Sequence, residues 1–349
     1  MAQWMLYGAN GYTGQLIARE AVRRGLTPTL AGREPGKVGA VARELGLPHR
    51  AFALGRPEDV VAQLNGMALV LHCAGPFSAT GAPMMDGCLR SGAHYLDITG
   101  EIDVFEQAVA RDAQARAAGL LLCPGVGFDV VPTDCVAAAL KDALPDATQL
   151  RLGFDSRSGI SPGTAKTAAE GLALGGRVRR DGRIVRVPHG YRIRRIDFGG
   201  GPRTAMTVAW GDVSTAFHTT GIPNIEVYAA VPPAAAFAAK LGGVLGSLMA
   251  VPLIRDAVAR RARLVQGPDT GARAKQPSFV WGEVENAGGV LRTCRMRTAN
   301  GYDFTVSSAL AIVASLLDGP APSGFSTPAR LMGQEFASRL PGSGAMAIT

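Results

Sequence analysis

The sequence predicts an α/β protein with a doubly wound parallel sheet and an α+β domain inserted after the sixth strand. Strand-like and helix-like segments alternate up to about residue 145, as is typical of parallel sheets covered by helices on both faces. An apolar strand near the N-terminus runs directly into a glycine-rich loop that opens a helix. From Gln149 the pattern changes, and strand-like segments begin to follow one another.

The first strand and the loop after it are the strongest motif in the chain. Apolar residues precede glycines 8, 11 and 14, and apolar positions at helical spacing follow. The first glycine ends the strand in a tight turn, the second lets backbone approach a pyrophosphate, and the third lets the helix pack closely. The free N–H groups and positive dipole end of that helix would face the phosphates. This Rossmann-type pattern predicts a dinucleotide, although a purely structural turn is the alternative in a chain with 45 glycines. The loop residues expected to bind it are Gly8, Asn10, Gly11, Tyr12, Thr13 and Gly14.

The tip of the second strand indicates which dinucleotide binds. A short strand over 27–31 is followed by Gly32, Arg33 and Glu34. NAD-binding folds usually hold an acid at this tip for the ribose 2′-hydroxyl, whereas an arginine suits a 2′-phosphate. Arg33 therefore predicts NADP. In the alternative interpretation Arg33 is a solvated loop charge and Glu34 binds the ribose of NAD.

Composition limits the class of protein. The 349 residues are 47% hydrophobic and 18% charged, which allows a large core and excludes extensive disorder. The net charge of +8 comes mainly from arginine, and no basic tract is interleaved with aromatic residues, so nucleic acid is not an expected partner. The five cysteines form no CxxC pair, which fits a reducing cytoplasm and argues against a metal site. No signal peptide is expected before the first strand, and we predict a cytoplasmic protein.

The alternation continues through the rest of the first domain. The fourth strand ends in Ala74, Gly75 and Pro76, whose small size would let the cofactor's ribose and nicotinamide lie against backbone. Ligands of such sheets bind outside the carboxyl ends of the strands. We expect helices over 12–24, 37–46, 57–64, 81–91, 103–118 and 132–143, and strands over 50–54, 68–73, 94–98 and 120–123.

A family resemblance rests on five motifs of this region. They are Gly8–Gly14, Ala31–Arg33, Gly75–Phe77, Tyr95–Asp97 with Gly100–Glu101, and the second glycine-rich turn Gly127–Asp134. Together they resemble the saccharopine dehydrogenase-like oxidoreductases, a group that includes the trans-acting enoyl reductases. The resemblance covers the first 145 residues well and later residues loosely. It implies an NADP-binding N-terminal domain and little about the substrate.

The second half of the chain indicates an antiparallel α+β domain. A hairpin is expected across 286–289, and a helix over 302–317 should return to the first domain, which the resemblance also suggests. A short helix over 328–339 and a loose tail over 341–349 follow. We therefore predict an NADP-binding domain over 1–147, an inserted substrate and dimerisation domain over 148–300, and a return helix with the tail over 301–349. Other expected elements are strands over 150–155, 184–187, 205–210 and 225–231 and a helix over 161–174.

Two surface features suggest partners. The segment Ala234–Ile254 is apolar except for Lys240, and we interpret it as a buried or homodimer-interface helix. An interfacial or acyl-lined surface is the second interpretation, and a membrane-spanning helix is the third. The stretch Arg177–Arg195 holds eight arginines against Asp181 alone. It indicates a solvated hairpin face or a docking site for an anionic partner, such as an acidic carrier protein, a phosphorylated or carboxylated substrate, or a membrane surface.

Residues for proton transfer are less clearly marked. No tyrosine has a lysine four positions later, which excludes the common Tyr-x-x-x-Lys mechanism of carbonyl reduction. Asp129 lies in the second glycine turn, where it could also only cap the next helix. Lys166 lies in the first turns of the helix after Ser161, and His218 lies in a strand-like segment. These three residues are the catalytic candidates, and Asp97 and Glu101 are expected near the cofactor edge.

The sequence thus predicts an NADP(H)-dependent oxidoreductase acting on a small-molecule or acyl substrate. Reduction of an activated C=C bond in an acyl or polyketide-type enoyl substrate is the favoured reaction, because of the apolar segment and the arginine-rich stretch. Saccharopine-type imine or amino-acid chemistry is the alternative, with Arg192, Arg194 or Arg195 as possible carboxylate ligands. From another class, the chain could be a redox sensor that binds NADP without turnover.

Overall fold

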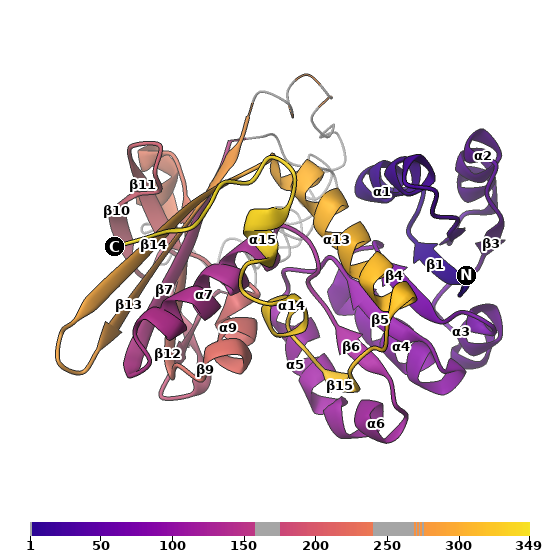
Figure 1. Cartoon of the computed structure of the whole chain (residues 1–349), viewed down its shortest axis with the longest axis horizontal. Helices are drawn as coiled ribbons and strands as arrows, with labels where there is room; N and C mark the ends of the chain where they lie inside the picture. Colours follow the sequence, from indigo (N-terminus) through magenta and orange to yellow (C-terminus); the bar gives the residue numbers. More distant parts are fainter. Residues whose placement is uncertain (1, 158–174, 240–268, 270, 272, 274–275) are drawn as a thin grey trace. The chain divides into compact units, whose positions relative to one another are not determined.

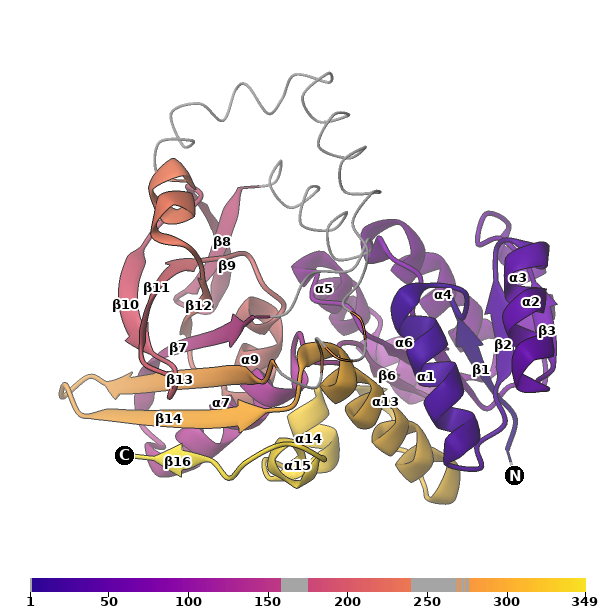
Figure 2. The same ribbon diagram turned by 90° about the horizontal axis from the view of Figure 1, so that it is seen from above.

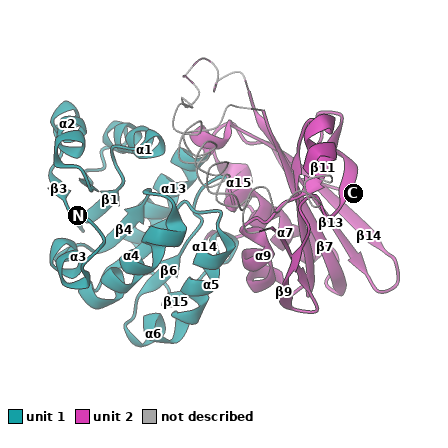
Figure 3. Ribbon diagram, turned by 180° about the vertical axis from the view of Figure 1, so that it is seen from behind, with its two compact units in different colours: residues 1–128, 305–331 teal, residues 129–304, 332–349 magenta. Residues whose placement is uncertain are grey.

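The computed structural model describes residues 2–157, 175–239, 269, 271, 273 and 276–349. The chain divides into two compact units (Figure 3). Unit 1 comprises Met1–Phe128 and Thr305–Leu331, and unit 2 comprises Asp129–Phe304 and Met332–Thr349. The domain boundaries predicted after residues 147 and 300 differ from these divisions.

Unit 1 contains a seven-stranded sheet in the order β15-β6-β5-β4-β1-β2-β3, and every strand pair in it is parallel. The strand order reverses at β1, as in doubly wound folds. The chain first adds β2 and β3 on one side of β1 and then adds β4, β5 and β6 on the other side. The predicted fold class is thereby confirmed. The strands are β1 (Trp4–Tyr7), β2 (Thr29–Gly32), β3 (His49–Ala51), β4 (Leu69–His72), β5 (His94–Asp97), β6 (Leu121–Cys123) and β15 (Gly324–Phe325).

Helices cover both faces of this sheet (Figures 1 and 2). Met5 and Tyr7 of β1 belong to a buried cluster with side chains of α3, α4 and α5. Successive strand residues point to opposite faces, so Leu6 points to the other side, where α1 and α13 lie. The helices are α1 (Tyr12–Arg23), α2 (Pro35–Leu45), α3 (Pro57–Leu64), α4 (Phe77–Ser91), α5 (Ile102–Ala110), α6 (Asp112–Ala117), α13 (Gly301–Asp318) and α14 (Pro328–Met332).

Unit 2 is organised around a nine-stranded sheet in which β10-β11-β12-β7-β13-β14-β16 form the main path and the hairpin β8–β9 branches from β12. The pair β7–β12 is parallel and the other pairs are antiparallel. The sheet is therefore mixed, and the prediction of an antiparallel domain was wrong for this pair. The strands are β7 (Ala147–Ser156), β8 (Gly176–Arg180), β9 (Arg183–Val187), β10 (Ile193–Asp197), β11 (Pro202–Thr207), β12 (Asn224–Ala230), β13 (Ser278–Asn286), β14 (Leu291–Thr298) and β16 (Ala347–Ile348).

The helix α7 (Val131–Ala143) packs against this second sheet. A Cβ built on Gly282 of β13 would lie 2.6 Å from side-chain atoms of both Val136 and Leu140, so glycine allows the helix to approach. The helix α9 (Asp212–Thr220) contacts α7 and β12, and the short α15 (Phe336–Arg339) also contacts α7. The sequence predicts α7 as the last element of the first domain, whereas in the structure it packs with unit 2.

Several local predictions were wrong. His218 lies in the helix α9, not in a strand, because buried Val213 and Ala216 place an apolar face at helical spacing. The tail predicted to be loose includes β16, which pairs with β14 through Cys294 and Arg295. The helix predicted over 328–339 is two short helices, α14 and α15, separated by Gly333, whose φ of 85° breaks the first one.

Some predictions fall outside the described residues. These include Lys166, the helix over 161–174 and most of the apolar segment 234–254. Of that segment only its first six residues are described, and they belong to a helix over 233–239. Within the part of the chain that the structure describes, no helix is long and apolar enough to cross a membrane.

Candidate active site

The predicted phosphate-binding loop connects β1 to α1 in unit 1. Gly8 has a φ of 85°, which favours glycine. A Cβ on Gly8 would lie 2.7 Å from the main chain of both Cys73 and Ala74, and one on Gly14 would lie 2.2 Å from the Gly8 carbonyl oxygen. The loop therefore packs backbone to backbone against the end of β4 and against its own helix. Side chains at these two glycines would push the three segments apart.

The N-terminus of α1 is shaped to accept an anion. Gly11 is exposed and occupies the N-cap position, and no side chain caps this helix. The Gly11 N–H donates to the Gly8 carbonyl oxygen at 3.0 Å, and Gln15 Nε2 donates to the Asn10 carbonyl oxygen at 3.0 Å, which fixes the loop. Since an uncapped helix N-terminus carries unsatisfied donors and a positive dipole end, this loop fits a pyrophosphate.

The tip of β2 lies against the same loop. A Cβ on Gly32 would lie 2.7 Å from Asn10 Oδ1, so the absence of a side chain makes room for Asn10. Arg33 is exposed and makes no hydrogen bond or ion pair with another described residue. Glu34 instead pairs with Lys37 at 2.8 Å, and this hydrogen bond holds the pKa of the Glu34 carboxyl below its usual value. Arg33 is thus available for a 2′-phosphate, while Glu34 already has a partner.

The end of β4 forms a third wall of the cofactor site. Buried His72 contacts the Thr80 hydroxyl through Nε2 at 2.9 Å, and that hydroxyl lies 2.7 Å from the Ala74 carbonyl oxygen and 3.0 Å from that of Pro76. Burial lowers the pKa of His72 to about 3, so its ring is neutral. The Thr80 hydroxyl thus lies within hydrogen-bond distance of the His72 ring and of both carbonyl oxygens. This network holds the turn Ala74-Gly75-Pro76 in place.

The two acids expected near the cofactor edge, Glu101 and Asp97, accept hydrogen bonds from backbone N–H groups. Glu101 accepts hydrogen bonds from the N–H groups of Phe77 and Ser78 at 2.9 and 2.6 Å, so it caps α4. Asp97 is fully buried, and its carboxylate is held by one hydroxyl and two backbone N–H groups. These donors are Tyr95 Oη (2.6 Å), Thr99 N (2.9 Å) and Gly125 N (2.8 Å). Both acids shape the loops at the end of the sheet.

The catalytic candidate Asp129 is the first residue of unit 2 and is half-buried. Trp210 Nε1 donates to the Asp129 carbonyl oxygen at 2.6 Å, and the Trp210 ring packs against Phe154 with 4.8 Å between centroids. The N-cap residue of α7 is Val130, so Asp129 lies one position before the cap. Trp210 therefore fixes the backbone that carries the Asp129 carboxyl.

A buried polar cluster between α7 and α9 was not predicted. Asp212 is fully buried, and its carboxyl oxygens make no hydrogen bond with any described residue. The nearby Thr133 hydroxyl donates its proton to the Val130 carbonyl oxygen at 2.9 Å. Burial, followed by the charge of Asp134, raises the pKa of Asp212 well above its usual value. Ionisation of Asp212 is consequently less favourable in the folded protein than in the unfolded chain.

The structure brings some predicted residues together and separates others. The cofactor set Gly8, Asn10, Gly11, Tyr12, Thr13, Gly14, Arg33, Ala74, Gly75 and Pro76 lies on the ends of three adjacent strands of unit 1. Asp129 and His218 belong to unit 2. His218 is half-buried on α9, where its ring lies 5.5 Å from that of Phe217. Asp134, at the start of α7, accepts a hydrogen bond from Thr219 on α9 at 2.5 Å, which links these two helices.

Comparison with known proteins identifies the first domain. Residues 4–123 match the family described as the saccharopine dehydrogenase NADP binding domain. The human saccharopine dehydrogenase-like oxidoreductase is 31% identical over 150 residues, which are 37% of this chain and 35% of the human protein. The trans-acting enoyl reductase of Mycobacterium leprae is 31% identical over 138 residues, which are 37% of this chain and 33% of that protein. The match therefore spans about a third of the length of either relative.

Among solved structures, the apo, histidine-tagged saccharopine dehydrogenase (L-Glu forming) from Saccharomyces cerevisiae is similar over 100% of both chains. The TM-score is 0.65 at 10% sequence identity, so this comparison shows a shared fold. The match of residues 4–123 to the NADP binding domain confirms the predicted cofactor, NADP, and confirms the predicted resemblance for this domain.

Proposed function

We propose that this chain reduces an activated C=C bond of an acyl or polyketide-type substrate with NADPH, because residues 4–123 match the saccharopine dehydrogenase NADP binding domain. The observation that supports NADPH as the hydride donor is the phosphate-binding surface of unit 1. It consists of the uncapped N-terminus of α1 and of Arg33, which is not paired with another described residue. The substrate class is supported by the similarity to the trans-acting enoyl reductase of Mycobacterium leprae. NADPH supplies the hydride when it is bound.

The residues of unit 1 bind and orient the cofactor in this proposal. The Gly8–Gly14 loop holds the pyrophosphate against the helix N-terminus, and Arg33 holds the 2′-phosphate through charge-assisted hydrogen bonds. Gly75 presents bare backbone at the end of β4. His72, through Thr80, keeps that turn fixed, so the surface that the nicotinamide would contact is preorganised.

Proton supply is assigned to Asp129 in this proposal. Reduction of a C=C bond adds one hydride and one proton, and the proton must come from an acid near the reacting carbon. Trp210 Nε1 donates a hydrogen bond to the Asp129 carbonyl oxygen at 2.6 Å and so fixes the main chain of Asp129. This limits the positions that the half-buried Asp129 carboxyl can take. His218 on α9 and Lys166, which lies outside the described residues, are further candidates for orienting or protonating the substrate.

The test is incubation of the full chain with NADPH and an α,β-unsaturated acyl thioester. We expect the loss of NADPH absorbance to match, mole for mole, a product with two additional hydrogens. Turnover with an α-keto acid and an amine, but not with the thioester, would replace the enoyl assignment by imine reduction. Binding of NADPH without turnover of either substrate would indicate a redox sensor.

A pair of variants tests the proton-transfer assignment. Asp129→Asn keeps the shape of the side chain but cannot relay a proton, so turnover should fall by about 10²-fold or more. Asp142→Asn changes an exposed carboxylate on α7 and should retain full turnover. Unchanged turnover in Asp129→Asn, with NADPH binding intact, would remove Asp129 from the mechanism.

A further inference from the structure

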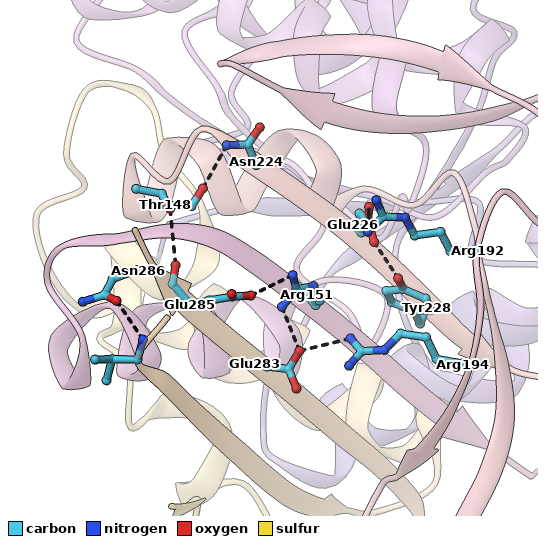
Figure 4. A network of polar contacts seen from close by, with 11 residues as sticks. Thr148, Arg151, Arg192, Arg194, Asn224, Glu226, Tyr228, Glu283, Glu285 and Asn286 are labelled. Carbon is cyan, nitrogen blue, oxygen red and sulfur yellow. Dashed lines mark hydrogen bonds and ion pairs between the residues drawn. The ribbon is translucent and has the colours of Figure 1, made fainter. Parts of the chain in front are cut away.

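Two arginines from the second half of the arginine-rich stretch, Arg192 and Arg194, lie beside glutamates of two strands in unit 2, β12 and β13 (Figure 4). Arg192 precedes β10 and Arg194 lies within it, while Arg151 projects from β7. In the register of the sheet, Glu226 of β12 and Glu283 of β13 flank Arg151 on its two sides. Charges of both signs therefore lie together on one face of the sheet, although the sequence shows a run of arginines only.

The ion pairs leave the arginines in fixed positions. Arg151 donates to Glu283 Oε1 at 2.9 Å and to Glu285 Oε2 at 3.0 Å, and Arg194 donates to the same Glu283 oxygen at 3.1 Å. Arg192 pairs with Glu226 Oε1 at 3.0 Å. Glu226 and Glu283 are 15% and 13% exposed, so the acids lie beneath the arginines they orient.

Aromatic rings complete the support of Arg194. Its guanidinium carbon lies 5.6 Å from the Trp281 ring centroid and 5.9 Å from that of Tyr228. The Tyr228 hydroxyl in turn donates to Glu226 Oε2 at 2.5 Å. Only Nη1 of Arg194 is used in a hydrogen bond to a described residue, and the side chain is 36% exposed. A held guanidinium with unused donors is a preorganised site for an anion.

These side chains surround an open hollow of about 280 Å³. Three arginines and two glutamates line it, and a third glutamate, Glu226, pairs with Arg192, so the charges of this network balance. Leu291, which is 48% exposed, supplies an apolar part of the wall, whereas the Tyr228 side chain is fully buried. The residues of the hollow are Arg151, Arg192, Arg194, Tyr228, Glu283, Glu285 and Leu291.

We propose that this hollow binds a small monocarboxylate with a short apolar chain. The planar fork of Arg194, which still has donors that no hydrogen bond to a described residue uses, matches a carboxylate. Because the charges of the network already balance, a monoanion adds less repulsion beside Glu283 and Glu285 than a phosphate dianion or a dicarboxylate would. The alkyl chain of the ligand would lie against Leu291. This proposal is independent of the proposed reductase activity.

Butyrate is the probe for the test, and butyramide, of the same shape without the charge, is the matched control. Saturation-transfer NMR and calorimetric titration of the full chain, with chloride used to equalise ionic strength, should show saturable butyrate binding in the millimolar range. Arg194→Gln should weaken butyrate binding at least tenfold. Arg186→Gln removes an exposed arginine of the same stretch on β9, outside the hollow, and should bind like the unmodified chain.

A second variant separates recognition of shape from attraction of charge. Arg194→Lys keeps the positive charge but loses the planar fork, so it should also weaken butyrate binding several-fold. Native circular dichroism of each variant shows that the fold is kept. The proposal would be overturned by equal binding of butyramide and butyrate, by unchanged binding in Arg194→Lys, or by an equal loss in Arg186→Gln.

Discussion

Replacing Asp97 by asparagine should change how the stability of the protein depends on pH. Burial raises the pKa of Asp97 from 3.8 to about 6, although the hydrogen bonds from Tyr95, Thr99 and Gly125 act in the opposite direction. The folded protein therefore binds a proton at this carboxyl more tightly than the unfolded chain does. Stability from this group is fully present below pH 3.8 and is lost as the pH rises through about 6.

The size of the effect follows from the same pKa values. One pKa unit corresponds to about 1.36 kcal/mol, so ionised Asp97 destabilises the folded state at pH 7 by about 3 kcal/mol relative to its protonated form. Asparagine can keep the local geometry. Its Oδ1 can accept from the N–H groups of Thr99 and Gly125, and its Nδ2 can donate to the Tyr95 hydroxyl after that hydroxyl rotates.

The assay is denaturant unfolding of the unmodified chain and of Asp97→Asn at several pH values between 4 and 8. The free energy of unfolding of the unmodified chain minus that of the variant should fall by about 2.4 kcal/mol from pH 4 to pH 7, because part of the full effect already lies below pH 4, and should stay constant above pH 7. Asp142→Asn removes an exposed carboxylate and should give a nearly constant difference. A difference for Asp97→Asn that is independent of pH, or that rises with pH, would refute the reasoning.

Three further predictions concern the cofactor loop and the buried acid of unit 2. In fluorescence titrations the unmodified chain should prefer NADPH over NADH at least tenfold, about 1.4 kcal/mol, and Arg33→Ala should remove most of this preference. The control Arg23→Ala, at the C-terminal end of α1, should keep the preference. Equal affinities of the unmodified chain for NADPH and NADH would disprove the role of Arg33. Gly14→Ala places a Cβ 2.2 Å from a backbone oxygen and should lower both the melting temperature and NADPH affinity, while Gly36→Ala, with open space around its Cβ, should be neutral or stabilising. Asp212→Asn should gain stability relative to the unmodified chain as the pH rises, because the pKa of Asp212 is raised and its ionisation is unfavourable in the folded state; parallel pH profiles would contradict this.

The order of elements in unit 1 could be predicted because the information is local. The span from Trp4 to Arg23 contains an apolar strand, a glycine turn and an apolar repeat at helical spacing. Each of these features narrows the secondary structure that the adjacent residues can adopt. The helix α3 was predicted with its observed bounds, since Pro57 marks its first turn and Leu64 its last apolar position. The same local signals placed Arg33 at a strand tip and led to the prediction of NADP.

The strands β8 and β10 could not be predicted because their partners are distant in sequence. Arg179 looks like a solvated charge in the sequence, yet it is 5% exposed and donates to the carbonyl oxygens of Val213 and Gly182. Arg194 pairs with Glu283, which lies 89 positions later. A run of arginines gives no indication of such acceptors, so the interpretation as a solvated hairpin face missed the burial of some members.

The least predictable part of the candidate site is the polar cluster around Asp212. In the sequence, an aspartate at the start of a helix only suggests a favourable interaction with the helix dipole. Its burial arises from the packing of α9 against α7, two helices whose sequences are separated by several strands. Burial is the largest cause that raises the pKa of this carboxyl, and it outweighs the causes that act in the opposite direction. Asp212 lies two positions after Trp210, whose indole N–H binds the Asp129 carbonyl oxygen, so the packing that buries this acid also holds the main chain of the proposed proton donor.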